Sequence, residues 1–340
     1  MSAPEAGGRP EGEGFLRLEI RPFSFRLPRP LQTSSGRLET KRGWLLRLQG
    51  PDGGVGWGEA APLESREMPV VAAALAALGQ GVERNDLERR LPALPPSLAF
   101  ALGAALAEAD GTVGDRAVGL GPDGGWLAAP PPAWLLPAGE AMLAALEQRL
   151  AGPAAAPPPT LKWKVAAAPD GLERQWLEHL LQRLPAEGRL RLDANGGWDR
   201  ATAAAWADRL EREPRLQWLE QPLGADDQGG LEALALRIPV ALDESLRLWP
   251  QLRHRWGGWQ VRRPSQDGDP RPLLTQLRRG APRLMLSTGF ETGIGARWPA
   301  HLAALQWRGP TPVAPGLAPD WSPAGPLFDR DPERVWAAAA

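Results

Sequence analysis

Two lysines near the middle of the chain, Lys162 and Lys164, are the residues best suited to proton transfer. The chain contains 39 Lys and Arg residues, but the only lysines are these two and Lys41. Arginine keeps its proton near neutral pH, whereas a lysine with a lowered pKa can release it. Two lysines kept two residues apart in so lysine-poor a chain indicate that at least one of them transfers a proton.

The residues around the lysine pair are typical of a strand. A proline run at 157–159 precedes the segment 161–165, and the turn sequence Pro-Asp-Gly at 169–171 follows it. Side chains alternate along a strand, so both ammonium groups are expected on one face, where each lowers the pKa of the other. For Lys-x-Lys alone, a solvated pair on an edge strand is the alternative, but the scarcity of lysine disfavours it.

Three carboxylates each follow a short apolar segment, namely Asp193, Glu220 and Asp243. In a parallel barrel the carboxyl ends of the strands form the face that carries the active site, so these side chains are expected to converge. An all-oxygen site without nearby cysteine or histidine favours Mg²⁺, or Mn²⁺, over Zn²⁺. One such residue alone is more often a helix cap, but three in succession beside a lysine pair are better explained by a bound cation.

The elements that must position these residues change in type along the chain. Alternating apolar and polar residues at 15–59, with a turn at 51–54, predict an antiparallel meander followed by helices at 68–78 and 97–109. After residue 112, seven short apolar segments alternate with amphipathic ones. They lie at 133–136, 161–165, 190–195, 216–220, 240–243, 259–263 and 283–287. This count favours a (β/α) barrel over an open sheet, and no G-x-G-x-x-G follows a strand.

Composition limits the class of protein. A chain of 340 residues can form one or two domains, and its net charge of −1 gives no electrostatic case for a nucleic-acid partner. The absence of cysteine excludes disulfides and thiolate metal sites, and the absence of tyrosine excludes a catalytic tyrosine. No signal-peptide pattern or long apolar run occurs, so we expect a soluble cytoplasmic protein without membrane insertion. The sequence makes no prediction of oligomeric state.

The motifs together resemble the enolase superfamily and, within it, the o-succinylbenzoate synthases of menaquinone and phylloquinone biosynthesis. They are Lys-x-Lys at 162–164, Leu-Asp-Ala-Asn-Gly at 192–196, Leu-Glu-Gln-Pro at 219–222, Asp-Glu-Ser at 243–245, and the segments 58–63 and 287–295. The resemblance covers about residues 15–325. It implies an α/β fold with a (β/α)7β barrel over 97–311. It also implies an α+β capping domain over 14–96, completed by 312–340. The small, polar composition of residues 1–13 predicts a disordered tail.

The resemblance also implies a role for each central residue. Lys164 would be the acid and base, with Lys162 supporting it by position and charge, and Asp193, Glu220 and Asp243 would hold Mg²⁺. The cation would bridge a carboxylate of a small-molecule substrate and spread the charge that develops as the α-proton leaves. The implied activity is that of a lyase, the syn-dehydration of 2-succinyl-6-hydroxy-2,4-cyclohexadiene-1-carboxylate to o-succinylbenzoate.

Arg263 departs from the family pattern, which has a lysine before the proline at this position. An arginine cannot serve as a second base, so racemisation and epimerisation with two bases are disfavoured, whereas a syn elimination needs Lys164 alone. Arg263 can instead hold a cation against the substrate ring. The alternatives are another reaction of the superfamily (cycloisomerisation, N-acylamino-acid racemisation or dipeptide epimerisation) and a catalytically inactive binding barrel.

Five further residues are candidates for substrate binding: Arg191, Asn195, Ser287, Gly289 and Ser35. The first two share the strand face of Asp193, although Arg191 is equally suited to filling the barrel interior. The hydroxyl of Ser287 and the backbone N–H of Gly289 are placed to bind a carboxylate. Ser35 lies in a loop with the small polar composition of a lid. Glu291 is expected to fix its own loop.

Overall fold

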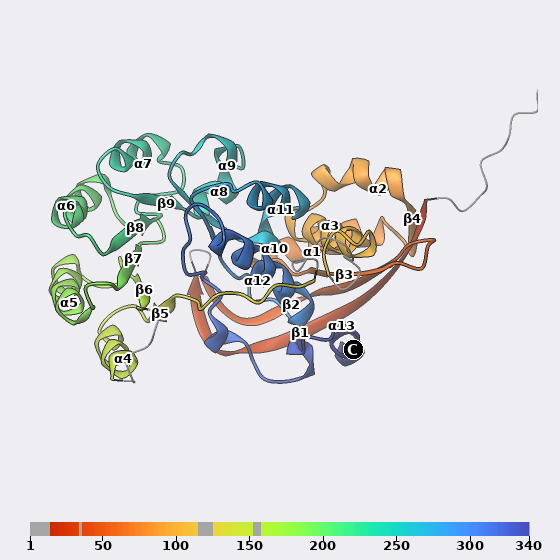
Figure 1. The fold of residues 1–340 in the computed structure, drawn as a ribbon, viewed down its shortest axis with the longest axis horizontal. Coiled ribbons are helices and arrows are strands. Elements are labelled where there is room, and N and C mark those ends of the chain that lie inside the picture. The colour runs from red at the N-terminus through yellow and green to blue at the C-terminus, as the bar shows by residue number, and fades with distance from the viewer. Residues whose placement is uncertain (1–13, 34–35, 115–124, 152–157, 340) are drawn as a thin grey trace, which may run out of the picture.

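The computed structural model describes residues 14–33, 36–114, 125–151 and 158–339. These residues form two sheets, a four-stranded antiparallel one in the order β3-β2-β1-β4 and a seven-stranded parallel one in the order β11-β10-β9-β8-β7-β6-β5. Figure 1 shows the parallel sheet surrounded by helices, with the long antiparallel strands beside it. The tail expected over 1–13 lies outside the described residues.

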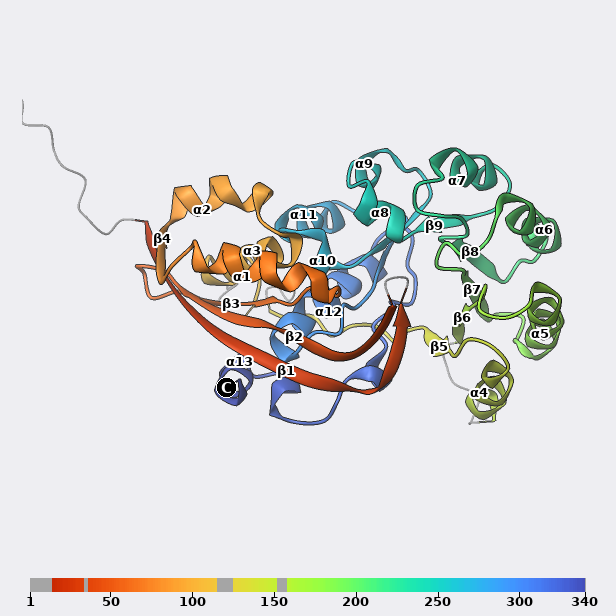
Figure 2. The same ribbon diagram turned by 180° about the vertical axis from the view of Figure 1, so that it is seen from behind.

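The antiparallel sheet confirms the predicted meander. Its strands are β1 (Phe15–Thr33), β2 (Gly36–Gln49), β3 (Val55–Ala60) and β4 (Gly81–Glu83). The helices that cover it are α1 (Met68–Ala76), α2 (Arg84–Arg90), α3 (Pro96–Ala109) and the C-terminal α13 (Pro332–Ala338). Successive side chains of a strand point to opposite faces of the sheet. Leu46 therefore packs toward α1 and α3, whereas its neighbour Leu45 packs toward α13. Figure 2 shows these helices on opposite faces of the sheet.

Glycine allows α3 to lie directly on β3. A Cβ atom at Gly56 would come within 1.8 Å of the carbonyl oxygen of Ala105, and one at Gly58 within 2.1 Å of that of Ala101. No other residue type fits at such a close approach of two backbones. The opposite face of α3 packs through Phe100 against the barrel helices. This helix therefore joins the two sheets.

The parallel sheet contains all seven predicted strands. They are β5 (Trp134–Leu136), β6 (Thr160–Lys164), β7 (Arg189–Asp193), β8 (Leu216–Glu220), β9 (Val240–Leu242), β10 (Trp259–Arg262) and β11 (Leu284–Leu286). The connecting helices are α4 (Ala141–Leu150), α5 (Asp170–Arg183), α6 (Arg200–Leu210), α7 (Gln228–Ala235), α8 (Glu244–Leu248), α9 (Leu252–Arg255), α10 (Pro264–Asp267), α11 (Arg271–Arg278) and α12 (Gly293–Trp307). Single 3-10 turns occur at Ser65–Glu67, Leu91–Ala93, Pro319–Trp321 and Pro326–Phe328.

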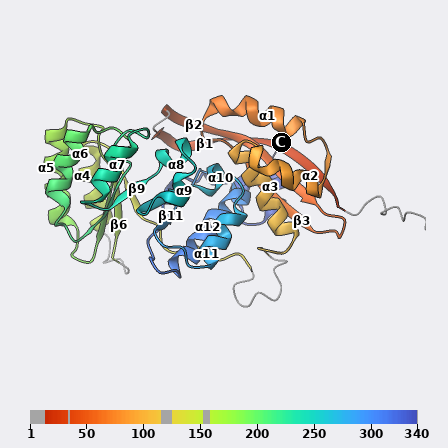
Figure 3. The ribbon, with the colours of Figure 1, turned by 90° about the horizontal axis from the view of Figure 1, so that it is seen from above.

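Residues that follow α12 close the ring between β11 and β5. The backbone N–H of Gly316 donates to the carbonyl of Leu286 at 2.8 Å, and that of Thr288 donates to Gly316 at 3.2 Å. On the other side, the N–H of Ala133 donates to the carbonyl of Pro315 at 2.9 Å. The fold is the (β/α)7β barrel that was predicted, and Figure 3 shows α4 to α7 along its outer wall.

The main core lies between the barrel strands and their helices. Trp163, Leu192 and Leu219 point outward from their strands and pack with residues such as Leu177 and Trp206. Each such side chain stabilises the fold by about 1.5–3 kcal/mol when it leaves water. Because side chains alternate, the residues between these apolar positions face the barrel interior. In the described part of the chain, no helix combines the length and apolarity needed to cross a bilayer.

Candidate active site

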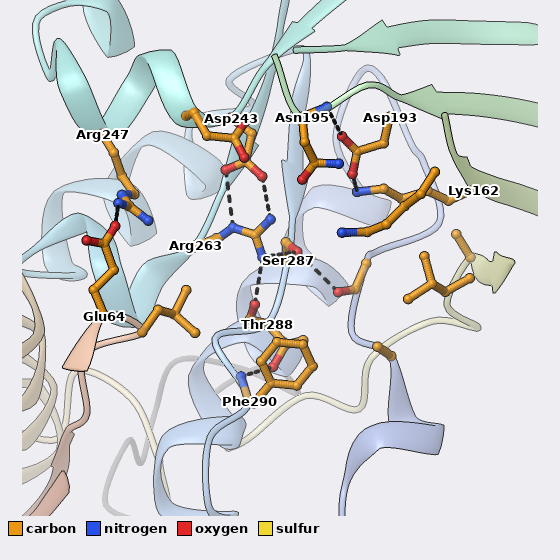
Figure 4. A pocket seen from close by; sticks show the side chains of 17 residues that line it. Glu64, Lys162, Asp193, Asn195, Asp243, Arg247, Arg263, Ser287, Thr288 and Phe290 are labelled. Atoms are coloured by element: carbon orange, nitrogen blue, oxygen red, sulfur yellow. Dashed lines mark hydrogen bonds and ion pairs between the residues drawn. The ribbon is translucent and has the colours of Figure 1, made fainter. Parts of the chain in front are cut away.

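Lys162 lies between two carboxylates inside the barrel. Its Nζ is 2.8 Å from Oδ2 of Asp193 and 2.6 Å from Oε1 of Glu220, and Figure 4 shows it directed at Asp193. Burial alone would lower the pKa of Lys162, but the two carboxylates outweigh burial and the pKa is raised. Lys162 is therefore a fixed positive charge.

Lys164, two residues further along β6, has the opposite electrostatics. Its pKa is lowered, chiefly by burial and further by the cations of Lys162 and Arg263, although Asp193 opposes the shift. The expectation that the two lysines lower each other's pKa thus holds for Lys164. It is wrong for Lys162, because Asp193 and Glu220 contact that ammonium directly.

The three predicted carboxylates form two groups. Asp193 and Glu220 share Lys162, whereas Asp243 pairs with Arg263, whose Nε lies 3.2 Å from Oδ1 and whose Nη2 contacts Oδ2. Among the described residues, no set of three His, Cys, Asp or Glu side chains is arranged to hold a metal ion. The three carboxylates were expected to converge on one point. They form two groups instead, because each buried carboxylate pairs with the nearest cation.

The chemistry of this donor set nevertheless fits a divalent cation. Strand register places Asp193 beside Lys164 and Glu220 beside Asp193, and all three carboxylates are less than a tenth exposed. Burial raises the pKa of Glu220, and Asp193 and Asp243 raise it further against the effect of Lys162. Carboxylates that repel one another in this way suit a hard, oxygen-binding cation such as Mg²⁺.

Arg263 is held by the barrel as well as by Asp243. Its Nη1 donates to Oγ of Ser287 at 3.1 Å and to the carbonyl of Thr288 at 2.9 Å, as Figure 4 shows. The guanidinium thus fixes the loop after β11 against the end of β9. Because several contacts hold it, the guanidinium of Arg263 provides a positive charge at a fixed position.

The remaining candidates differ in where they lie. Asn195 lines the pocket, and its backbone N–H donates to Oδ1 of Asp193 at 3.1 Å. Arg191 is fully buried beneath the site with its guanidinium 4.2 Å from the ring of Trp218. It therefore has the barrel-interior position, which was one of its two predicted roles.

The loop after β11 is organised by Glu291. Its Oε1 accepts from the N–H of Gly289 at 2.6 Å, and its Oε2 accepts from Oγ1 of Thr288 at 2.6 Å. Glu291 therefore fixes its loop, as expected. The prediction that Gly289 offers its N–H to a substrate carboxylate is wrong, because Glu291 already takes that hydrogen. Ser35 lies outside the described residues.

These side chains surround a pocket of about 100 Å³ at the carboxyl ends of the strands. Of the expected residues, it is lined by Lys162, Lys164, Asp193, Asn195, Asp243, Arg263 and Ser287. Glu220, Arg191 and Gly289 lie outside its lining. The wall toward the antiparallel sheet is made by Leu63 and Glu64, which follow β3, and by Glu244 and Arg247 of α8.

Known proteins are similar to this chain in sequence and fold. Residues 145–255 match the family model described as enolase C-terminal domain-like. The chain is 32% identical over 299 residues to the o-succinylbenzoate synthase of Thermosynechococcus vestitus, covering 84% of this chain and 88% of that protein. This chain belongs to the o-succinylbenzoate synthase family.

Solved structures agree with this family assignment. The o-succinylbenzoate synthase of Thermosynechococcus elongatus, solved with magnesium in its active site, superposes with a TM-score of 0.76 at 31% identity, covering 95% of this chain and 99% of that one. The L-Ala-D/L-Glu epimerase of Bacillus subtilis superposes with a TM-score of 0.66 at 22% identity, covering 91% of each chain. At this sequence identity, the similarity to the epimerase shows only that the two proteins share a fold.

In this o-succinylbenzoate synthase family member, the residues of the pocket wall opposite the lysines were not predicted from the sequence. Glu64 directly follows the quoted segment 58–63, and Glu244 is the middle residue of the quoted Asp-Glu-Ser, so both were next to recognised motifs. Burial raises the pKa of Glu244 to about 8, with Asp243 adding to the effect. Arg247 carried no signal in the sequence, because its partner Glu64 is 183 positions away.

Proposed function

We propose that this chain catalyses the Mg²⁺-dependent syn-dehydration of 2-succinyl-6-hydroxy-2,4-cyclohexadiene-1-carboxylate to o-succinylbenzoate. The observation that carries the proposal is Lys164, a partly buried amine inside the barrel whose pKa is lowered and which lies beside Asp193. Membership of the o-succinylbenzoate synthase family supports both the lyase activity and the substrate.

In the proposed mechanism, Lys164 performs both proton transfers. Its neutral Nζ removes the α-proton, the C–H electrons move into the ring, and the C–O bond breaks. The resulting ammonium gives the proton to the departing hydroxyl, so water leaves and an aromatic ring forms. One group suffices because both bonds break on the same face of the ring.

Three carboxylates, Asp193, Glu220 and Asp243, would hold Mg²⁺ in this proposal. The cation would stabilise negative charge on the substrate carboxylate as the α-proton leaves. Lys162 and Arg263 balance the charge of the same carboxylates. The magnesium in the structure of the Thermosynechococcus elongatus relative supports this choice of ion.

The position of the third lysine, Lys41, argues against a reaction with two lysine bases. Lys41 lies in β2, where its Nζ donates to the carbonyl of Ala61 at 2.8 Å, so it does not face Lys164. Arg263 has the position at which the family pattern has a lysine, and the pKa of Arg263 is raised by Asp243 despite its burial. One lysine therefore remains for proton transfer at the pocket.

Three finer assignments belong to the same proposal. The reaction serves menaquinone or phylloquinone biosynthesis, and the chain works in the cytoplasm. Residues 14–96 and 312–340 form a capping domain over a catalytic barrel of 97–311. The packing of α13 against the antiparallel sheet supports the inclusion of the C-terminal segment in the cap.

The direct test is an ultraviolet assay of o-succinylbenzoate formation by the purified chain. We expect turnover with Mg²⁺, none after chelation with EDTA, and recovery when Mg²⁺ is restored. Epimerisation of L-Ala-L-Glu, followed by solvent-deuterium incorporation, is the comparison reaction and is expected to be absent. Epimerisation without any dehydration would refute the proposed function.

A further inference from the structure

An ion pair between the two parts of the molecule forms the pocket wall opposite the lysines. Arg247 of α8 donates through Nη2 to Oε1 of Glu64, which follows β3 of the antiparallel sheet. Figure 4 shows this pair across the pocket from Lys162, with Arg263 between them. The side chain of Glu64 is 6% exposed and that of Arg247 is 32% exposed. Arg247 is thus the more accessible partner.

The other cations of the described pocket lining are already used by the proposed chemistry. Lys162 pairs with Asp193 and Glu220, Arg263 pairs with Asp243, and Lys164 is the proposed base. These partners belong to the proposed metal set. Arg247 differs, because its partner Glu64 has no part in that set and lies in the loop after β3 of the antiparallel sheet.

Glu64 also contacts a second arginine, so it can release the first at low cost. Its Oε2 pairs with Nη2 of Arg66, a side chain that is 80% exposed and does not line the pocket. A buried carboxylate that loses its only cation is strongly destabilised. Glu64 would keep Arg66 when Arg247 turns to another anion. A guanidinium also matches a carboxylate in shape, since it can donate two parallel hydrogen bonds.

We propose that Arg247 is a specificity residue that binds the second carboxylate of a dicarboxylate substrate in exchange for Glu64. This inference rests on the proposed function, whose substrate and product carry one carboxylate on the ring and one on the succinyl chain. The ring carboxylate belongs at the end of the pocket with Lys164 and the metal ligands. The succinyl carboxylate then reaches the wall formed by α8, where Arg247 receives it.

The test compares two ligands by isothermal titration calorimetry in the presence of Mg²⁺. The first is o-succinylbenzoate, and the second is its analogue with a primary amide in place of the succinyl carboxylate. A hydrogen bond to a charged group contributes enough for a preference on the order of tenfold or more. We expect the wild type to prefer the diacid by this factor and Arg247→Gln to bind both ligands equally. Unchanged affinity of Arg247→Gln for the amide shows that the variant is folded.

Two further variants sharpen the result. Glu64→Gln frees Arg247 from its partner, so it is expected to bind the diacid several-fold more tightly. Arg66→Gln removes the cation that Glu64 keeps when Arg247 turns to the ligand, so this variant is expected to prefer the diacid less strongly than the wild type does. A preference for the diacid that persists in Arg247→Gln, or weaker diacid binding by Glu64→Gln, overturns this inference.

Failure of the proposed function gives a different pattern. In that case the wild type itself shows no dehydration and binds neither ligand. Wild-type dehydration together with an unchanged ligand preference in Arg247→Gln refutes only the role of Arg247.

Discussion

At the scale of single residues, the three lysines show what burial and neighbouring charges do to one kind of group. Burial lowers the pKa of Lys41 to about 8 even though Glu59 opposes it, and it also lowers that of Lys164. Asp193 reverses the effect at Lys162. All three lysines are buried to a large extent. The scarcity of lysine therefore indicates positions inside the protein. The proposed base differs from Lys41 in lining the pocket and from Lys162 in having a lowered pKa.

Arg263 gives a prediction about metal binding. In the wild type Mg²⁺ must compete with the guanidinium for Asp243, whereas in Arg263→Met it need not. The variant loses the counter-charge of a buried carboxylate, which costs roughly 3 kcal/mol without metal. A ligand that binds only the folded state raises the melting temperature. We therefore expect Mg²⁺ to raise the melting temperature of Arg263→Met by more than that of the wild type in differential scanning calorimetry.

The comparison must be made against samples in EDTA. Arg253→Met, which removes a partner of Asp267 away from the lysine site, is the control and should respond to Mg²⁺ as the wild type does. A smaller Mg²⁺ response in Arg263→Met than in the wild type would show that the arginine aids the metal instead of competing with it.

At the scale of elements, the loop after β3 is tied to both sheets. Lys41 of β2 donates to the carbonyls of Ala61 at 2.8 Å and Pro62 at 3.2 Å. From the barrel side, Gln266 of α10 donates to Ala61 at 3.0 Å and accepts from the N–H of Leu63 at 3.1 Å. The loop that carries the pocket wall is thus fixed at the junction of the two sheets.

Replacing Lys41 tests this attachment. Lys41→Met leaves the carbonyl of Pro62 without this donor and Glu59 without its nearby cation, so we expect a loss of about 2–4 kcal/mol in the free energy of unfolding. Urea denaturation followed by tryptophan fluorescence measures it. Arg17→Met is the control, because that side chain is 69% exposed and such changes stay within about 0.5 kcal/mol. Equal stability of the two variants would contradict the role of Lys41.

The sequence predicted all seven strands of the parallel sheet but missed some short elements elsewhere. The strand of Lys162 and Lys164 was predictable because apolar residues alternate with the lysines between turn signals. Strand β4 and helix α2 were not, since these short elements lie outside the repeated alternation of strand and helix that indicated the equally short barrel strands. The pairing of Asp243 with Arg263 depends on the packing of neighbouring strand ends. Spacing along the chain placed both residues at the site but could not reveal that they contact each other.

At the scale of the whole molecule, Glu59 joins the antiparallel sheet to the barrel. Its Oε2 accepts from the N–H of Thr292 at 2.8 Å, from Oγ1 of Thr292 at 2.6 Å and from the N–H of Gly295 at 3.2 Å. These groups begin α12, whose first N–H groups have no partner within the helix. A buried carboxylate of one sheet therefore caps a helix of the other.

The same carboxylate makes stability depend on pH. Burial raises the pKa of Glu59 from 4.5 to about 7 in the folded chain, with Glu291 adding to the effect. The stabilisation by protonated Glu59 is complete below pH 4.5 and is lost as the pH rises through about 7. The loss is on the order of 3 kcal/mol.

The glutamine variant Glu59→Gln removes this titration. We expect the unfolding free energy of the wild type, measured relative to Glu59→Gln by urea titrations, to fall between about pH 4 and about pH 8. A difference that stays constant or rises over this range would contradict a buried carboxylate with a raised pKa.

The measurement that tests the account most directly is the rate of dehydration by Lys164→Ala and Lys164→Arg with saturating Mg²⁺. Arginine keeps the charge but cannot release the proton, so both variants should lose kcat by roughly a thousandfold or more while still binding o-succinylbenzoate. Activity of either variant within about tenfold of the wild type would show that another group removes the proton and would contradict the proposed mechanism.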